Sequence, residues 1–312
     1  MQTFEQIMKE QFKRRNIKYR LFFTGLLLEK YIFMFDGIDN ANKRGLLLRN
    51  YYFLMRYLDD IIDNNIVVNN YNSIEDRVKY LEGKLEHITC KVTPKDNVDK
   101  MINECHTFAQ KLVFSMDEES KYIISSLIFD GYRLLEWQKN KELKIVSSKE
   151  LEKHFYDLDI LGTISGCLKI YDEDKKYLDI LYPLGTASRK YYDMRDFIED
   201  MRIGLINISL EDLNKYNITE SDIRTVMSIN EKYIDICKNK GFNNEKLLKL
   251  IPSSILDLLY DNCMYCENQL SKYHNNLIDN DLPILRNSTN MTLKVGYEYS
   301  IKKYLKKINS NK

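Results

Sequence analysis

The chain has 312 residues, and its 47 basic and 46 acidic side chains leave a net charge of only +1. This balance produces no general attraction to nucleic acid, so we expect no nucleic-acid partner. Apolar residues make up 44% of the sequence, which excludes a wholly disordered chain. Only 4 prolines and 11 glycines are present to interrupt helices, and this scarcity favours an all-α fold.

Helical periodicity runs through nearly the whole chain, and no stretch alternates long enough to predict a strand. Ser147 or Ser148 suits the N-cap of the helix that contains Glu150 and Glu152. With no linker or short repeat, we expect one domain over residues 1–312. Turn residues predict breaks at 69–72, 93–94, 207–212, 241–244 and 279–283. The helices expected from this pattern cover residues 3–19, 42–64, 73–90, 97–115, 118–141, 148–169, 173–201, 219–239, 244–274 and 286–307.

No targeting or disulfide pattern is visible. The first residues include Glu5 and Glu10 and lack the apolar core of a signal peptide, and the apolar run 21–28 is too short to span a bilayer. Six irregularly spaced cysteines predict reduced thiols in a cytoplasmic protein. Cys263 and Cys266 lack a second such pair, so buried apolar positions on a helix are favoured over a zinc site.

An acidic cluster follows an apolar and aromatic run in YYFLMRYLDDIIDNN, residues 51–65. On a helix, Asp59 and Asp63 share one face about 6 Å apart along the axis, with Asp60 beside them. Like charges at this spacing repel each other unless a cation lies between them. The acidic cluster, which Arg56 precedes, is therefore either a solvated helix edge or half of a cation site.

A second acidic cluster lies in KYYDMRDFIEDMRIG, residues 190–204. Its three aspartates follow one helical stripe with a glutamate beside them, and arginines are interleaved. The carboxylates are Asp193, Asp196, Glu199 and Asp200, and the arginines are Arg189, Arg195 and Arg202. A single acidic run is more often a solvated face, but two runs with flanking arginines favour a diphosphate site. Mg²⁺ or Mn²⁺ binds carboxylate oxygens, and arginine neutralises the phosphate oxygens that the metal leaves uncovered.

The two acidic clusters, in their order along the chain, resemble the two aspartate-rich motifs of the squalene/phytoene synthase family. The first family motif, Y-x-x-x-R-x-x-D-D-x-x-D, is matched by Tyr52, Arg56, Asp59, Asp60 and Asp63. The second, N-x-x-R-D-x-x-E-D followed by R-x-G, is matched by Arg195, Asp196, Glu199, Asp200, Arg202 and Gly204. Between them, YDLDILGTISG is similar to Y-x-x-x-x-A-G-T-V-G, with Tyr156, Gly162 and Thr163 in register.

The resemblance implies a single-domain isoprenoid synthase-type helical bundle around a central active-site cavity. It also implies an Mg²⁺-dependent prenyl transferase that condenses two prenyl diphosphates head-to-head to a squalene- or phytoene-like product. No dinucleotide-binding fingerprint occurs, so NADPH is not indicated. The expected location is the cytoplasm, with peripheral membrane contact for release of an apolar product.

The same resemblance implies roles for individual residues. The expected metal ligands are Asp59, Asp60, Asp63, Asp193, Asp196, Glu199 and Asp200. The expected catalytic residues are Asp59, Asp63, Asp196, Asp200 and Tyr156. The expected substrate contacts are Arg56, Tyr52, Arg189, Arg195, Arg202 and Tyr192. An aromatic pocket wall is expected from Tyr51, Tyr52, Phe53, Tyr156 and the region of Phe129 and Tyr132, although ordinary core packing is the favoured interpretation of any single ring.

The sequence departs from the family pattern at three places. Arg189 stands where the family has Gln, and Tyr192 stands where it has a metal-binding Asn. Residues 29–31 lie where the family has an S-x-S-F element, and they do not match it. Two alternatives stay open: a terpene synthase or transferase that acts on one prenyl diphosphate, and a non-catalytic assembly factor of the same fold.

Overall fold

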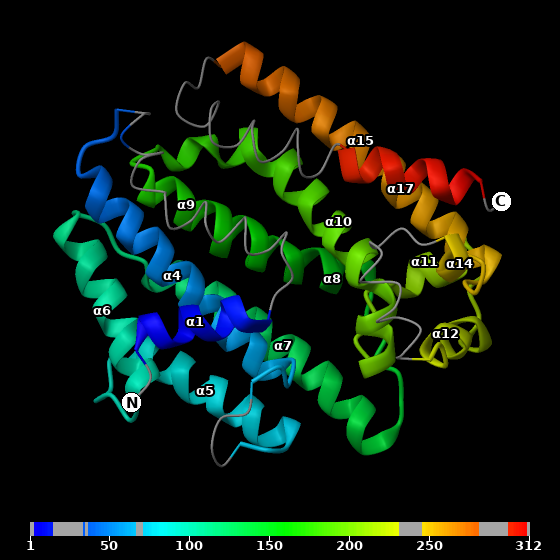
Figure 1. Cartoon of the computed structure of the whole chain (residues 1–312), viewed down its shortest axis with the longest axis horizontal. Coiled ribbons are helices and arrows are strands. Elements are labelled where there is room, and N and C mark those ends of the chain that lie inside the picture. Colours follow the sequence, from blue (N-terminus) through cyan, green and yellow to red (C-terminus); the bar gives the residue numbers. More distant parts are fainter. Residues whose placement is uncertain are drawn as a thin grey trace. The chain divides into compact units, whose positions relative to one another are not determined.

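The structure is a computed structural model that describes residues 3–14, 34, 37–66, 71–230, 245–280 and 299–310. The described residues form helices and irregular connections without a strand, which confirms the all-α fold (Figure 1). No helix in these ranges is both long and apolar enough to cross a membrane.

The chain divides into two compact units. The first comprises Met1–Leu135 and Asp157–Leu178, and the second comprises Glu136–Tyr156 and Asp179–Lys312. The organisation of residues 1–312 as one domain stays a prediction.

The first unit is built around α4 (Ala41–Ile62), which contacts helices α1, α5, α6 and α9. Its large apolar side chains, such as Leu47, Leu54, Leu58 and Ile61, are completely buried. Burial on several sides explains why the helix is apolar over so much of its length before the acidic cluster. The surrounding elements are α1 (Phe4–Arg14), α5 (Ile74–Cys90), α6 (Asn97–Lys111), α7 (Asp117–Asn140, as far as Leu135), η1 (Tyr156–Ile164), α9 (Ser165–Ile170) and η2 (Lys175–Tyr177).

Buried charges join helices within this unit. Lys84 of α5 lies 2.6 Å from a carboxylate oxygen of Asp96 and 2.9 Å from one of Asp99, at the first turn of α6. Arg44 of α4 donates to the carbonyl oxygens of Lys169 and Ile170 at 3.1 and 3.0 Å, and so satisfies the C-terminal end of α9. Both cations are buried yet paired, which is the condition under which a buried charge is tolerated.

The segment expected to be one α-helix over 148–169 is instead interrupted by η1, a π-helix. The side chain of Thr163 donates to the carbonyl of Leu158 at 2.9 Å, five residues earlier. A Cβ at Gly162 would lie 2.6 Å from a side-chain carbon of Ile123, so η1 and α7 approach closely at this glycine. π-helices are rare, and periodicity alone does not distinguish one from an α-helix.

The second unit contains two long helices, α10 (Leu178–Ile203) and α15 (Ser253–Asn280). Sulfur atoms join them: the Cys263 thiol lies 3.5 Å from the Met194 thioether, and the Cys266 thiol lies 3.5 Å from the carbonyl of Ala187. Cys263 and Cys266 are both completely buried, as expected from the sequence. The other helices are α8 (Ser148–Phe155), α11 (Leu210–Lys215), α12 (Glu220–Met227), α14 (Glu245–Leu248) and α17 (Tyr299–Asn309).

Several expected helix ends are corrected by local geometry. The helix expected over 97–115 ends at Lys111, and Val113 has a φ of 69° in the turn that follows. The helix expected over 173–201 begins at Leu178, after a short 3₁₀ turn, and continues to Ile203. Gly204, at a φ of 93°, ends it because few other residues adopt this conformation. Of the two candidate caps for α8, Ser147 is the N-cap, in a capping box with Glu150.

Two further corrections concern the C-terminal half. The helix expected over 244–274 is divided at Pro252 into α14 and α15, and α15 continues to Asn280. The expected break at 207–212 contains the start of α11. The helix expected over 219–239 ends at Met227, with Ser228 as its C-cap. Parts of the helices expected at 3–19, 219–239 and 286–307 lie outside the described residues, as do the break at 241–244 and segments 21–28 and 29–31.

Candidate functional site

The first acidic cluster lies at the C-terminal end of α4. Arg56 forms an ion pair with Asp59, one turn further along the helix, and a longer contact of 3.8 Å with Asp60. Burial by itself lowers the pKa of Arg56, but the carboxylates of Asp59 and Asp60 raise it by more. Asp60 is only 2% exposed and accepts a hydrogen bond from Gln11 of α1. The solvated-edge interpretation therefore does not describe Asp60.

Asp63 lies directly after the last residue of α4, and its backbone N–H still donates to the carbonyl of Asp59. Burial raises the pKa of Asp63 well above its ordinary value, and the carboxylate of Asp59 raises it further. Arg56 opposes this rise, whereas Asp60 and Asp130 of α7 add to it. Arg133 pairs with Asp130 at 3.1 Å, and Arg77 also interacts with Asp63, so the carboxylates of Asp59 and Asp60 are the main electrostatic cause of the rise after burial.

The second acidic cluster lies on α10. Asp193 is the buried member, and the guanidinium of Arg189 lies 3.6 Å from its carboxylate. The side-chain amide of Asn207 donates to the same oxygen at 3.3 Å. Arg189 also lies over the ring of Phe155, 5.1 Å from its centroid. Arg189, which replaces the family's Gln, thus contacts both an aromatic ring and a carboxylate.

Arg195 and Tyr192 lie together on the same helix. The guanidinium of Arg195 donates twice to the carboxylate of Asp196, at 2.8 and 2.5 Å, and lies 4.6 Å from the centroid of the Tyr192 ring. Tyr192, which replaces the family's Asn, therefore contributes an aromatic face to an arginine. The remaining members of this cluster, Glu199, Asp200 and Arg202, are half-buried.

The aromatic residues expected at the site differ in environment. Tyr156 is 42% exposed, and its ring centroid lies 6.1 Å from that of Tyr182 in the second unit. In the first unit Tyr52 is half-buried, with its ring 5.8 Å from that of Phe53. Tyr51 and Phe53 are buried core residues. Their burial agrees with the core-packing interpretation.

The structure thus brings together Tyr52, Arg56, Asp59 and Asp60 on α4 with Asp63 at its C-cap, and the residues from Arg189 to Arg202 on α10, each group within its own unit. Across the part of the chain that the structure describes, no group of three or more His, Cys, Asp or Glu side chains is arranged to hold a metal ion. The carboxylate oxygens at the end of α4 match the donors that Mg²⁺ prefers, and burial together with the neighbouring carboxylates raises the pKa of Asp63. The oxygen atoms of these residues are therefore suitable ligands for a hard divalent cation, although they do not form a complete set of ligands.

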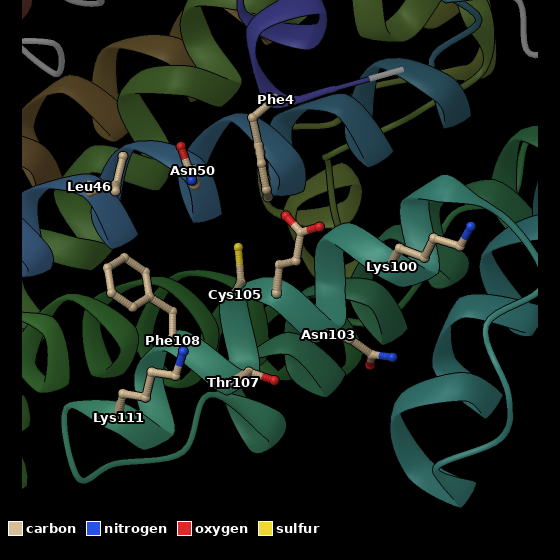
Figure 2. A pocket seen from close by; sticks show the side chains of 10 residues that line it. Phe4, Leu46, Asn50, Lys100, Asn103, Cys105, Thr107, Phe108 and Lys111 are labelled. Carbon is tan, nitrogen blue, oxygen red and sulfur yellow. The ribbon is translucent and has the colours of Figure 1, made fainter. Parts of the chain in front are cut away.

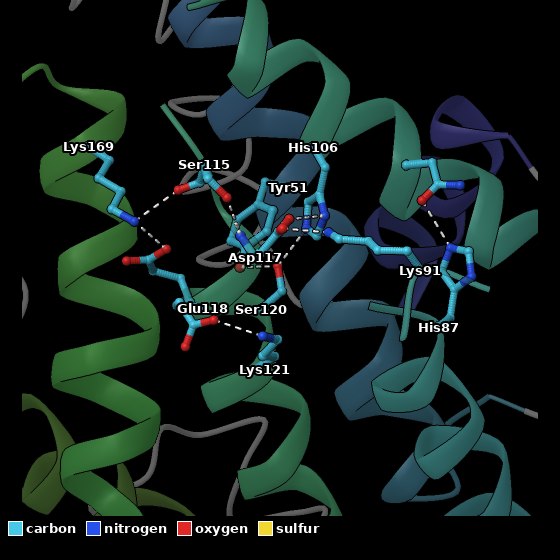
Figure 3. Close-up of polar contacts among 12 residues, drawn as sticks. Tyr51, His87, Lys91, His106, Ser115, Asp117, Glu118, Ser120, Lys121 and Lys169 are labelled. Carbon is cyan, nitrogen blue, oxygen red and sulfur yellow. Dashed lines mark hydrogen bonds and ion pairs between the residues drawn. The ribbon is translucent and has the colours of Figure 1, made fainter. Parts of the chain in front are cut away.

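Sequence reasoning missed a buried hydrogen-bonded array in the first unit (Figure 3). The Nδ1 atom of His106 lies 2.8 Å from a carboxylate oxygen of Asp117, and its Nε2 atom lies 2.9 Å from Oγ of Ser120. The hydroxyl of Tyr51 lies 3.0 Å from the same Oγ, and Lys91 forms an ion pair with Asp117. These contacts have the order of a catalytic triad, but Ser120 is completely buried, so no substrate reaches it. The array joins α4, α6 and α7.

A pocket of about 580 Å³ was also missed; it lies between α1, α4 and α6 (Figure 2). Leu46 and Asn50 of α4 face Cys105 and Phe108 of α6, and Phe4 of α1 lies nearby. The volume suits a small molecule. Burial raises the pKa of the Cys105 thiol, so this thiol is not an activated nucleophile. The residues of this pocket and of the array have no recognisable spacing in the sequence.

No family model, curated protein or solved structure matches the chain. The resemblance to the squalene/phytoene synthase family therefore rests on the motif residues named above, and membership of the family stays a prediction.

Proposed function

We propose that the protein is a Mg²⁺-dependent prenyl transferase that joins two prenyl diphosphates head-to-head into a squalene- or phytoene-like product. The observation that carries this proposal is the grouping of Asp59, Asp60 and Asp63 at the end of α4, where burial first, and the neighbouring carboxylates after it, raise the pKa of Asp63. A divalent cation relieves the repulsion between these carboxylates and at the same time provides coordination positions for phosphate oxygens.

Arginines beside both acidic clusters support the same proposal. Arg56 contacts Asp59, and Arg195 contacts Asp196. A guanidinium binds phosphate oxygens with paired hydrogen bonds, and a diphosphate carries more negative charge than one carboxylate, so these arginines would contact a bound diphosphate while the carboxylates contact the metal. Bound Mg²⁺ would supply electrostatic stabilisation of the departing diphosphate. Asp59, Asp60 and Asp63 would hold metal at the C-terminal end of α4, and Asp193, Asp196, Glu199 and Asp200 would do so on α10.

Incubation of the purified chain with geranyl, farnesyl or geranylgeranyl diphosphate and Mg²⁺ tests the proposal. Mass spectrometry should detect a hydrocarbon with twice the carbon number of its substrate. Asp59→Asn and Asp196→Asn should each lower Mg²⁺-dependent diphosphate release by at least about a hundredfold, because each removes a metal-binding charge.

The matched controls are Asp39→Asn and Asp179→Asn, which change exposed aspartates near α4 and on α10 and should leave turnover unchanged. Full turnover in both site variants would refute the metal-site assignment. Diphosphate that stays intact in every incubation would favour the assembly-factor alternative.

The contacts of Arg189 and Tyr192 favour a second candidate, a transferase or cyclase that uses one prenyl diphosphate. Arg189, at the position of the family's Gln, lies 3.6 Å from the Asp193 carboxylate. Tyr192, at the position of the family's Asn, contacts Arg195. The natural product of such an enzyme has as many carbon atoms as one prenyl substrate. In that case Arg189→Gln combined with Tyr192→Asn should shift the products toward a hydrocarbon with twice that number. An unchanged product ratio would show that these positions do not decide the chemistry.

A further inference from the structure

The pocket between α1, α4 and α6 has an apolar wall and a polar rim (Figure 2). Its wall includes Phe4 of α1, Leu46 of α4 and Phe108 of α6. The lining residues that the structure describes include no member of either acidic cluster, and all of them belong to the first unit. A volume of about 580 Å³ lies within the range of small-molecule sites.

The side-chain amide of Asn50, in the lining, is oriented by its neighbour in the sequence. Nε and Nη2 of Arg49 donate to Oδ1 of Asn50 at 3.1 and 3.0 Å. Because a guanidinium can only donate, this contact fixes which end of the amide is the oxygen. The group of Asn50 that remains for a ligand is therefore its NH₂, which is a donor.

A second amide in the lining is arranged in the same way. Nε2 of His87 lies 2.9 Å from Oδ1 of Asn103. Because an amide oxygen can only accept, the imidazole donates, and the NH₂ of Asn103 is again the group that remains. Both amides therefore favour a ligand that accepts hydrogen bonds.

Three charged side chains of α6 follow one stripe along the pocket. Lys100, Glu104 and Lys111 are exposed, and their positions fall within an arc of about 40° on the helix. Among the described residues, none of the three has an ion-pair partner. On the other two helices at the pocket, the opposite charges of Arg49 and Glu5 cancel. The stripe therefore leaves one net positive charge, which attracts an anion.

We propose that this pocket binds an organic anion with an apolar body, such as a medium-chain carboxylate. The body packs against Phe4, Leu46 and Phe108, and the head accepts hydrogen bonds from the Asn50 amide and from lysine ammonium groups. A carboxylate has acceptors only, which suits a lining whose free polar groups are mainly donors. The inference does not rest on the proposed function, because it concerns a different part of the first unit.

Isothermal titration calorimetry with three ligands of equal chain length tests the proposal. Octanoate, octylammonium and octanol share an apolar body and differ only in the head group. Octanoate should bind at least about tenfold more tightly than the other two, because only its head matches the donors and the charge. The titrations contain chelator and neither Mg²⁺ nor prenyl diphosphate, so their failure is separate from failure of the proposed reaction.

Asn50→Asp tests the donor directly. An aspartate keeps the contact with Arg49 but replaces the NH₂ with a carboxylate oxygen, so octanoate should bind at least about tenfold more weakly. Asn214→Asp, at an exposed position of α11, is the matched control and should bind octanoate as the unmodified protein does. Circular dichroism checks that each variant is folded.

Charge variants of α6 should act in opposite directions. Lys100→Gln combined with Lys111→Gln should weaken octanoate binding about fivefold, whereas Glu104→Gln should strengthen it about twofold to threefold. Lys144→Gln combined with Lys149→Gln, at exposed lysines of the second unit, is the matched control for the lysine pair and should have no effect.

Absence of octanoate binding would overturn the proposal, as would equal binding of all three ligands. Tighter binding of octylammonium, or weaker octanoate binding by the Glu104→Gln variant, would assign the pocket to a cation and overturn it as well. Equal losses in the Asn50→Asp and Asn214→Asp variants would show that octanoate does not bind at this pocket.

Discussion

Gly204 shows how one residue controls the end of the acidic helix α10. Its φ of 93° lies in the region that glycine adopts readily and other residues avoid. A Cβ at this position would lie 2.2 Å from Cγ of Trp137, so the indole ring packs directly against the backbone. The glycine is therefore required by conformation and by packing together.

We predict that Gly204→Ala destabilises the protein by about 2–4 kcal/mol, because the backbone conformation and the contact with Trp137 both become unfavourable. Urea unfolding followed by circular dichroism measures the loss. Fluorescence of Trp137, the only tryptophan, reports the local change.

Gly83→Ala is the matched control, since a methyl group at this position of α5 would have no heavy atom within 4 Å beyond its own stretch of helix. It should be neutral or stabilising by about 0.5–1 kcal/mol, because alanine favours a helix interior. Equal stability of the Gly204→Ala variant and the unmodified protein would refute the packing argument.

At the scale of helices, the array around His106 joins three segments of the first unit. Tyr51 belongs to α4, His106 to α6, and Asp117 and Ser120 to α7 (Figure 3). A neutral imidazole accepts at Nε2 from Ser120 and places its Nδ1–H beside the Asp117 carboxylate, 2.8 Å away. Tyr51 then donates to Ser120. The packing of these helices therefore depends on His106 being neutral.

We predict that His106 makes the protein less stable as the pH falls. Burial lowers the pKa of His106 to about 4, although Asp117 opposes this effect. In the unfolded chain the pKa is about 6.5, so the unfolded state takes up a proton that the folded state rejects. The contribution is therefore fully present above about pH 6.5 and is lost as the pH falls toward about 4.

Comparison of urea unfolding at about pH 7 and about pH 4.5 measures this effect, which should amount to roughly 2–3 kcal/mol. Between these two pH values, the His106→Gln variant should lose less stability than the unmodified protein, and the difference should be about this amount. The reason is that glutamine forms hydrogen bonds but does not titrate. His274→Gln, at a half-buried position of α15, controls for loss of a histidine. Identical pH profiles for the unmodified protein and the His106→Gln variant would contradict the prediction.

At the scale of the whole molecule, both units are parts of one continuous chain. The chain passes between them within α7, at the start of η1 and at the start of α10. The crossing within α7 lies inside an uninterrupted helix, and loss of one part of a helix weakens the hydrogen bonds of the next turn.

We therefore predict a single cooperative unfolding transition, in agreement with one domain over residues 1–312. Trp137 fluorescence reports the second unit, and circular dichroism reports helices of both. The urea unfolding transition followed by Trp137 fluorescence should coincide with the one followed by circular dichroism. Separate midpoints would show that the units unfold independently and would contradict the single-domain prediction.

The sequence by itself determined the helical class, most helix positions and the placement of both acidic clusters on long helices, because periodicity and turn residues act locally. It did not reveal η1, where Gly162 closely approaches Ile123 on another helix. Nor did it reveal the buried state of Asp60, which Gln11 contacts from 49 residues away.

Only the tertiary structure decided these features and the environments of the site residues. Charge state, burial and hydrogen bonding depend on which side chains the fold brings together, as the array around His106 shows. Its members lie on different helices and follow no recognisable spacing. A local pattern therefore predicts where a carboxylate lies on a helix, whereas its partners and its pKa depend on packing between distant parts of the chain.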